Sequence, residues 1–259
     1  MISVVVRTKN QAPALLFLLK NLKERYWEDI TEVIVLDNAS TDETQEICSA
    51  YGARLVNIEH FTYGGSANTA AREASQNIVV IFSAHSYPIS HDFFKLIKER
   101  FEQKPSLAGL RCLHSTNDYR NYINKVTAHQ DPNKSGLIFS GSAFNKAVWE
   151  KHPFREDVAT FEDKEWSKRV VEEGYEIEFV PSIFHYEIKR SKKQELFRFK
   201  NDLVGNYQLW GQNVGVKQAF NGFFGSIYRA FLQFLRAIWY GTKRFLYIIK
   251  FQFNKPTKF

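Results

Sequence analysis

The segment EVIVLDNASTDET, residues 32–44, joins a run of aliphatic residues to a polar turn. Comparable apolar runs occur at residues 2–6, 53–57 and 78–82, with helical patterns between them. Strands that alternate with helices in this rhythm are typical of a mostly parallel sheet with helices on both faces. The sequence therefore predicts a Rossmann-like α/β fold.

Local patterns indicate how some of the other segments fold. Ser40 and Glu43 have the spacing of a capping box, which predicts the start of a helix. Residues 114–136 are polar and rich in turn-forming residues, so we expect a long loop of the kind that compact domains keep for function. A further helix is expected at about residues 160–173.

Three loops follow strands of the predicted sheet, at residues 7–11, 37–44 and 83–88. In open α/β sheets, ligands bind beyond the carboxyl ends of the strands, so these loops should form the binding site. No G-x-G-x-x-G follows the first strand, and no G-x-x-x-x-G-K-[ST] occurs anywhere. The dinucleotide and P-loop interpretations therefore lose their main support.

The composition is that of a folded protein with an appendage. The chain has 259 residues, of which 44% are hydrophobic and 24% are charged, enough for one sizeable α/β domain. Its first residues lack the pattern of a secretory signal, and Cys48 and Cys112 have no metal-type spacing. These features predict two reduced thiols and a cytoplasmic location.

Charge divides the chain into two parts. The net charge is +7, and no acidic residue follows Asp202, whereas eight basic residues do. We therefore predict a catalytic domain at residues 1–200 and a basic, aromatic helical region at residues 201–259. Such asymmetry indicates an anionic partner for the second part.

The basic region has the pattern of an amphipathic helix. Arg229, Arg236, Lys243 and Lys250 recur every seven residues, with a wide apolar side rich in phenylalanine opposite them. This pattern predicts a helix on the inner face of the cell membrane, at an anionic lipid surface. Charges interrupt every apolar run, which excludes a membrane span. The alternative is a helix that packs on the catalytic domain or on a second subunit of a homo-oligomer.

Four motifs, in order along the chain, resemble those of the family 2 glycosyltransferases, inverting enzymes with the GT-A fold. They are VVVRTKN at residues 4–10, VLDNASTDET at 35–44, YGGSANTAA at 63–71 and the long run HPFREDVATFEDKEW…FHYE at 152–187. The last motif is most similar to that of bacterial rhamnosyltransferase-like members. The resemblance implies a hexosyltransferase that uses a UDP- or dTDP-sugar.

The resemblance also implies which residues bind the donor. Asp37 would accept a hydrogen bond from the imide N–H of a pyrimidine base, although it could also organise the turn that follows it. Arg7 and Thr8 would lie along the nucleotide, with Arg7 near the diphosphate. Asn68 keeps its place in a donor-site motif, and Ser83 falls where the family's metal-binding D-x-D begins.

One departure from the family concerns the metal. Ser83 and His85 replace the two aspartates of D-x-D, and His185 matches a position that often holds a metal-ligating histidine. We therefore expect His85 and His185 to share a divalent cation, Mn²⁺ or Mg²⁺. The alternatives are that His85 hydrogen-bonds the diphosphate or that the enzyme uses no metal.

The adjacent acids Glu162 and Asp163 are the candidate catalytic residues. Inverting transfer needs one base to take the proton of the acceptor hydroxyl. The resemblance assigns this role to Asp163, with Glu162 supporting it or touching the acceptor. Acids also occur at helix N-termini for purely electrostatic reasons, and spacing alone does not separate the two explanations.

The acceptor expected from the membrane-associated helix is a lipid-linked or surface-polysaccharide precursor. Two other functions stay open: a catalytically degenerate protein that only binds nucleotide sugars, and a protein that binds nucleic acid through its basic region. No nucleic-acid motif is present, so we do not expect nucleic acid as a partner.

Overall fold

The computed structural model of the chain describes residues 1–158, 160–187 and 190–257. The chain forms two compact units, Met1–Leu209 and Trp210–Phe259. The boundary predicted at residue 200 lies inside helix α9 (Lys192–Trp210), which belongs almost entirely to the first unit.

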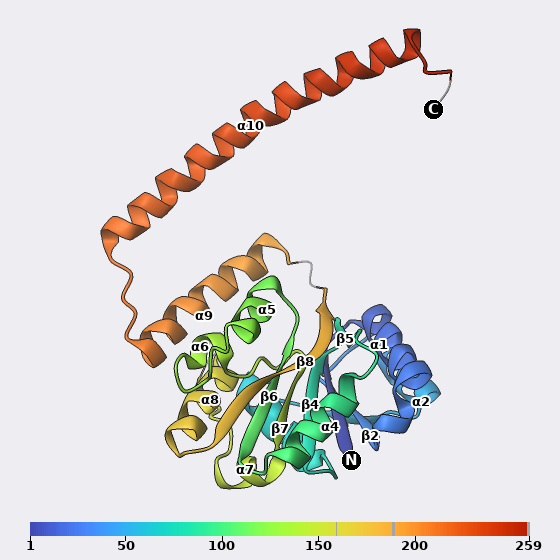
Figure 1. Cartoon of the computed structure of the whole chain (residues 1–259), viewed down its shortest axis with the longest axis vertical. Coiled ribbons are helices and arrows are strands. Elements are labelled where there is room, and N and C mark those ends of the chain that lie inside the picture. The colour runs from blue at the N-terminus through green and yellow to red at the C-terminus, as the bar shows by residue number, and fades with distance from the viewer. Residues whose placement is uncertain (159, 188–189, 258–259) are drawn as a thin grey trace. The chain divides into compact units, whose positions relative to one another are not determined.

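The first unit is built on an eight-stranded sheet with the strand order β3-β2-β1-β4-β7-β6-β8-β5 (Figure 1). Strands β3, β2, β1 and β4 run parallel, as do β6 and β8, whereas β7 is antiparallel to β4 and β6, and β5 to β8. The strands are β1 (Ile2–Thr8), β2 (Glu32–Asp37), β3 (Arg54–Asn57), β4 (Ile78–Ser83), β5 (Ser86–Pro88), β6 (Leu107–Leu113), β7 (Ser142–Asn145) and β8 (Glu176–Tyr186).

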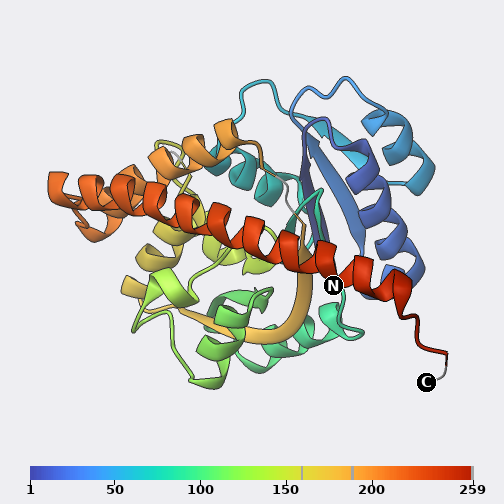
Figure 2. The same ribbon diagram turned by 90° about the horizontal axis from the view of Figure 1, so that it is seen from above.

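Helices cover both faces of this sheet, which confirms the predicted architecture (Figure 2). Alternate strand residues point to opposite faces: Val4 and Val6 pack with α1, α2 and α4, whereas Val5 packs with α3, α7 and α8. The helices are α1 (Ala12–Arg25), the short 3-10 helix η1 (Trp27–Asp29), α2 (Thr44–Tyr51), α3 (Tyr63–Glu73), α4 (Phe93–Gln103), α5 (Thr116–Ile123), α6 (Pro132–Ser135), α7 (Lys146–Lys151) and α8 (Glu162–Glu172).

Two local predictions are wrong. Helix α2 begins at Thr44 rather than at a capping box, because the Ser40 hydroxyl is bonded to the Asp37 carboxylate. The segment expected to be a loop at residues 114–136 contains α5 and α6. Its buried Asp118 accepts two hydrogen bonds from Arg111 on β6, and this tertiary ion pair holds α5 against the sheet.

The second unit is dominated by α10 (Val216–Phe253), a helix of 38 residues. At 1.5 Å per residue, it is about 57 Å long. Its large apolar side chains are exposed, including Phe231 and Phe245 at 56% and 63%. Within the described ranges, no helix combines the length and apolarity needed to cross a membrane.

Candidate active site

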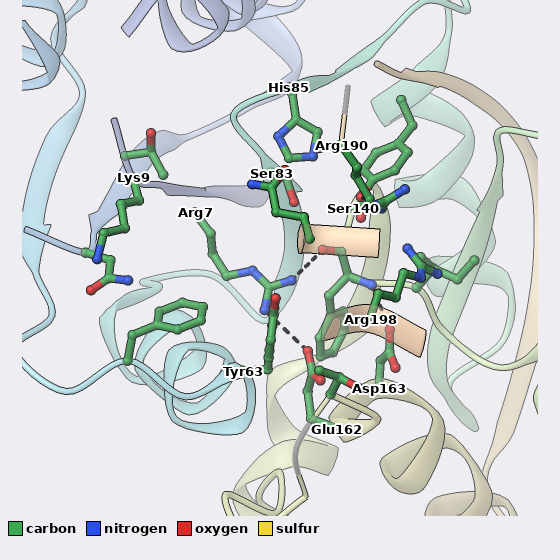
Figure 3. Close-up of a pocket in the computed structure, with 18 of the residues that line it drawn as sticks. Arg7, Lys9, Tyr63, Ser83, His85, Ser140, Glu162, Asp163, Arg190 and Arg198 are labelled. Carbon is green, nitrogen blue, oxygen red and sulfur yellow. Dashed lines mark hydrogen bonds and ion pairs between the residues drawn. The ribbon is translucent and has the colours of Figure 1, made fainter. Parts of the chain in front are cut away.

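A cavity of about 550 Å³ lies at the carboxyl ends of β1 and β4, beside the N-terminus of α8 (Figure 3). This is the ligand-binding edge expected of such a sheet. Six residues predicted from the sequence line this pocket: Arg7, Thr8, Ser83, His85, Glu162 and Asp163. The structure thus brings together residues that are up to about 150 positions apart in the chain.

Arg7 is the central cation of the pocket. One of its terminal nitrogens, Nη1, contacts Glu162 Oε1 at 3.3 Å and donates to the Ser66 hydroxyl at 3.2 Å. The other, Nη2, donates to the Phe139 carbonyl oxygen at 2.6 Å. Its guanidinium also lies 5.7 Å from the ring centroid of Tyr63. Because every one of these partners is fixed by the fold, Arg7 is held in one orientation at the end of β1.

Glu162, which is buried, and Asp163, which is half-buried, form a pair of carboxyl groups at the start of α8. Burial and then the negative charge of Asp163 raise the pKa of Glu162 to about 7, against the opposing effect of Arg7. Burial also raises the pKa of Asp163, but the Phe139 N–H and the charge of Lys164 oppose this rise. Two adjacent carboxyl groups do not easily ionise together, so Glu162 is the better site for a shared proton and Asp163 the better base.

Asp163 is also the better oriented of the two carboxylates. Its Oδ2 accepts a hydrogen bond from the Phe139 N–H at 3.1 Å, and its Oδ1 accepts one from the Lys164 N–H at 2.8 Å. Each oxygen keeps a lone pair for a further donor. A carboxylate fixed in this way can accept a proton from a hydroxyl group bound in the pocket.

His85 lies opposite these acids and is neutral. Burial, followed by the positive charges of Arg190 and Arg7, lowers its pKa below the ordinary value of 6.5. Its Nδ1 lies 2.8 Å from the Gln11 side-chain oxygen, and its ring is 5.0 Å from that of Tyr186. With the hydrogen on Nδ1, toward Gln11, the buried Nε2 offers a lone pair and has no hydrogen-bond partner in the described structure.

The expected metal pair does not assemble. His185 is exposed on β8, with its ring 5.2 Å from that of Tyr87, and it does not line the pocket. In the part of the chain that the structure describes, no three His, Cys, Asp or Glu side chains cluster as a metal site would require. The residues present therefore do not fit a cation shared by His85 and His185.

Asp37 lies at the rim rather than in the pocket wall. Its two oxygens accept hydrogen bonds from the Ser40 hydroxyl and the Ser40 N–H, at 2.5 and 3.0 Å. The residue thus organises the turn after β2. Its neighbour Asn38 lines the pocket, and so does Thr8, the residue that pairs with Asp37 in the sheet.

Asn68 faces the interior of the protein. Its amide nitrogen donates to the Phe154 carbonyl oxygen and to Glu156, and its oxygen accepts from the Trp149 indole and the Phe154 N–H, all at 2.8–2.9 Å. All the hydrogen-bonding capacity of this buried side chain is used by the protein itself. This corrects its assignment as a donor contact: Asn68 joins α3 to the segment that precedes α8.

The sequence analysis missed the contribution of α9 to the pocket. Arg198 and Asp202 on this helix line the pocket, as does Arg190 just before it. Gly205 allows the helix to approach Phe161, since a Cβ at this glycine would lie 1.7 Å from a ring carbon of Phe161. The only available signal was the run of basic residues after β8, which carries no family motif.

Comparison with known proteins establishes the family. Residues 3–169 match the model described as Glycosyl transferase family 2, which is more than half of the chain. The chain belongs to this family. A relative from Methanococcus voltae, a dolichyl N-acetyl-alpha-D-glucosaminyl phosphate 3-beta-D-2,3-diacetamido-2,3-dideoxy-beta-D-glucuronosyltransferase, is 23% identical over 233 residues. The alignment covers 76% of this chain and 70% of that protein.

Solved structures agree with this assignment at the level of the fold. A mannosyltransferase from Pyrobaculum calidifontis, in complex with GDP-Man and Mn²⁺, superposes with a TM-score of 0.66 at 20% identity, covering 84% of this chain and 66% of that one. The glucosyl-3-phosphoglycerate synthase of Mycobacterium tuberculosis, with Mn²⁺ and UDP-glucose, gives a TM-score of 0.59 at 16% identity, covering 81% and 78%. The sheet is of the GT-A type, and the chain spans about two thirds of the mannosyltransferase.

Proposed function

We propose that this chain transfers a hexosyl group from a nucleoside diphosphate donor to a hydroxyl acceptor, with inversion at the anomeric carbon. One observation carries the proposal: the buried Glu162 and the half-buried Asp163 lie together in the pocket that Arg7, Ser83 and His85 also line. An inverting displacement needs one base on the side of the sugar opposite the leaving group. A fixed carboxylate that lies across the pocket from His85 meets this need (Figure 3).

The chemical step is a single displacement. The acceptor oxygen attacks the anomeric carbon as Asp163 takes its proton, and the bond from that carbon to the diphosphate breaks with its electron pair on the phosphate oxygen. Glu162, whose raised pKa of about 7 makes it the better holder of a shared proton, hydrogen-bonds the acceptor or the sugar. The support for these roles is the difference in hydrogen bonding between the two carboxyl groups.

Donor binding is assigned to the other side of the pocket. Thr8 Oγ1 and His85 Nε2 are both buried without a hydrogen-bond partner in the described structure, and such atoms call for a ligand group. Ser83 and Arg7 lie beside them. Asp37, at the rim, accepts a hydrogen bond from the imide N–H of uracil or thymine through a lone pair that its two hydrogen bonds from Ser40 leave free.

The residues described in the pocket do not fit a resident metal. Structural neighbours were solved with Mn²⁺ and a nucleotide sugar. Here a cation would find histidine nitrogens on His85 and His114, because the carboxylates described in the pocket are engaged by Arg7, by backbone N–H groups or by Arg198. No step above depends on Mn²⁺ or Mg²⁺.

The acceptor is proposed to be a lipid-linked precursor, reached from the cytoplasmic face of the cell membrane. The supporting feature is α10, whose exposed phenylalanines suit the acyl boundary and whose basic stripe suits anionic head groups. The Methanococcus relative is a transferase named for a dolichyl N-acetyl-alpha-D-glucosaminyl phosphate, which is also lipid-linked. A rhamnosyl donor remains one candidate within the hexosyl class.

The donor is tested with a panel of UDP-, dTDP- and GDP-sugars, measured by thermal stabilisation and by release of nucleoside diphosphate. We expect a uridine or thymidine nucleotide sugar to raise the melting temperature and to be consumed when acceptor is present. Stabilisation by a donor without any transfer to hydroxyl acceptors would favour the degenerate binding protein instead.

The membrane partner is tested in the full chain by changing the four basic residues of the stripe to glutamine. We expect sedimentation with vesicles of anionic lipid to fall, since each lysine or arginine near such a surface contributes about 1 kcal/mol. The control changes four exposed lysines of the first unit. Equal sedimentation of both proteins would favour packing of α10 on a second copy. The residues changed are Arg229, Arg236, Lys243 and Lys250, and in the control Lys20, Lys95, Lys98 and Lys151.

A further inference from the structure

The leaving group of the proposed reaction carries negative charge that must be stabilised in the pocket, and this inference rests on that proposed function. When the sugar departs, a nucleoside diphosphate is released with additional negative charge on its terminal phosphate. Proteins stabilise such charge either with a divalent cation or with fixed side-chain cations and dipoles. The residues of the pocket allow these two solutions to be compared.

The ligands that a divalent cation prefers are scarce in the described pocket. Glu162 pairs with Arg7, and Asp202 pairs with Arg198 at 3.4 Å. Asp163 accepts two backbone N–H bonds and is needed as the base. The nitrogens of the two lining histidines, His85 and His114, do not make a metal site without a free carboxylate beside them.

Fixed cations, in contrast, are plentiful. Four basic residues line the pocket: Arg7, Lys9, Arg190 and Arg198. Two of them are already paired with carboxyl groups, Arg7 with Glu162 and Arg198 with Asp202. For Arg190, the described structure gives one hydrogen bond, from Nη2 to the Tyr186 hydroxyl at 3.3 Å, and no ion pair with a carboxylate.

Arg190 is also positioned near the donor side of the pocket. Its partner Tyr186 packs its ring 5.0 Å from that of His85. The charges of Arg190 and Arg7 both act on the His85 imidazole. In Figure 3, Arg7 and Arg190 flank Ser83 on opposite sides. These contacts place the half-buried Arg190 guanidinium next to the space in which the diphosphate would lie.

We propose that Arg190, together with Arg7, binds the donor diphosphate and neutralises the departing phosphate, so that this glycosyltransferase needs no divalent cation. The bidentate geometry of a guanidinium matches two phosphate oxygens, and its positive charge does not depend on pH. His85 Nε2 accepts a hydrogen bond from a hydroxyl group of the donor. The Tyr186 hydroxyl accepts a hydrogen bond from Arg190 Nη2 and so helps to orient the guanidinium.

The test compares the affinities of nucleoside diphosphates and monophosphates by calorimetry in excess chelator. The probes are UDP, dTDP and GDP with the corresponding monophosphates, and the proteins are the wild type, Arg190→Gln and Lys193→Gln. Lys193 is exposed at the start of α9 and does not line the pocket, so it controls for the lost charge. In chelator, the wild type should bind its preferred diphosphate at least about tenfold more tightly than the monophosphate, since charge-assisted hydrogen bonds to the second phosphate are lost in the latter.

Arg190→Gln should abolish most of this preference while leaving monophosphate affinity unchanged, which a merely structural role for Arg190 would not produce. Adding Mn²⁺ should change the wild-type preference less than about threefold. Diphosphate binding by the wild type only with Mn²⁺ would overturn this inference while preserving the proposed function. An unchanged preference in Arg190→Gln would also overturn it. If no nucleotide bound with or without Mn²⁺, the proposed function itself would fail.

Discussion

Replacing Arg7 by glutamine should make the stability of the catalytic unit depend on pH in a range where the wild type is insensitive. Arg7 and Glu162 are both buried, with side-chain exposures of 11% and 3%, and their charged atoms are 3.3 Å apart. With an effective dielectric constant of about 20, this attraction is about 5 kcal/mol. Because one pKa unit corresponds to about 1.4 kcal/mol, its loss should raise the pKa of Glu162 by about three and a half units.

The direction of the pH effect follows from the folded and unfolded states. In the wild type, the folded pKa of Glu162 is about 7, above the ordinary value of 4.5. The stability that Glu162 contributes to the folded state is therefore fully present below pH 4.5 and is lost as the pH rises toward 7. Above pH 7, its effect on the free energy of unfolding is constant. In Arg7→Gln the stability continues to fall above pH 7, because Glu162 stays protonated in the folded state. The free energy of unfolding should fall by about 3 kcal/mol more than in the wild type between pH 7 and about 9.

The assay is urea unfolding at pH 6, 7, 8 and 9, followed by tryptophan fluorescence. Arg7→Lys keeps the charge and should retain most of the wild-type pH profile. Arg54→Gln removes one member of an exposed ion pair with Glu73 and should lower the free energy of unfolding by under about 1 kcal/mol at every pH. Parallel profiles for Arg7→Gln and the wild type would refute the electrostatic coupling of Arg7 to Glu162.

Three further substitutions test the supporting structure. Asn68→Ala leaves the Phe154 backbone groups unpaired in the interior, so the free energy of unfolding should fall by about 3 kcal/mol and the melting temperature by about 10 °C, measured by thermal denaturation. Gly205→Ala forces Phe161 to move, which should lower donor affinity measured by calorimetry. The free energy of unfolding should fall by about 1–3 kcal/mol, partly offset by the better helix propensity of alanine. Thr8→Val removes a buried hydroxyl without a partner in the described structure, so it should raise stability slightly and weaken donor binding about tenfold in the same calorimetric assay.

Matched variants are available for these tests. Gly222 has no atom within 4 Å of an added Cβ, so Gly222→Ala should not weaken donor binding. Asn213 is exposed, and Asn213→Ala should leave the melting temperature unchanged. Equal effects in the test and control variants would contradict the packing described above.

The features that sequence analysis predicted correctly depend on local patterns. The buried β-branched strands carry their own signal, and the loops that follow β1 and β4 reach the pocket because parallel strands end at one edge of the sheet. Arg7 and the Glu162–Asp163 pair were identifiable for this reason and from the family motifs. Their burial and their contact with each other depend on the tertiary structure, which the spacing of residues along the sequence does not reveal.

The features that could not be predicted from the sequence depend on strand register and on contacts between residues far apart in the chain. Strand β8 extends to Tyr186, and successive residues of a strand face opposite ways. Tyr186 therefore meets His85, whereas the adjacent His185 packs near Tyr87. Arg190 reaches the pocket through a segment that lies beyond the matched family region, so neither periodicity nor motif could indicate it.

The most direct test of the catalytic assignment is a comparison of donor binding and sugar transfer in Asp163→Asn. The amide keeps the size of the side chain but cannot take a proton, so turnover should fall by about 10²–10⁴-fold. Donor affinity should change less than about threefold, because the role proposed for Asp163 is to take a proton from the acceptor. Asp157→Asn, a fully exposed acid near α8, should leave both quantities unchanged. Turnover in Asp163→Asn equal to that of the wild type would contradict the account.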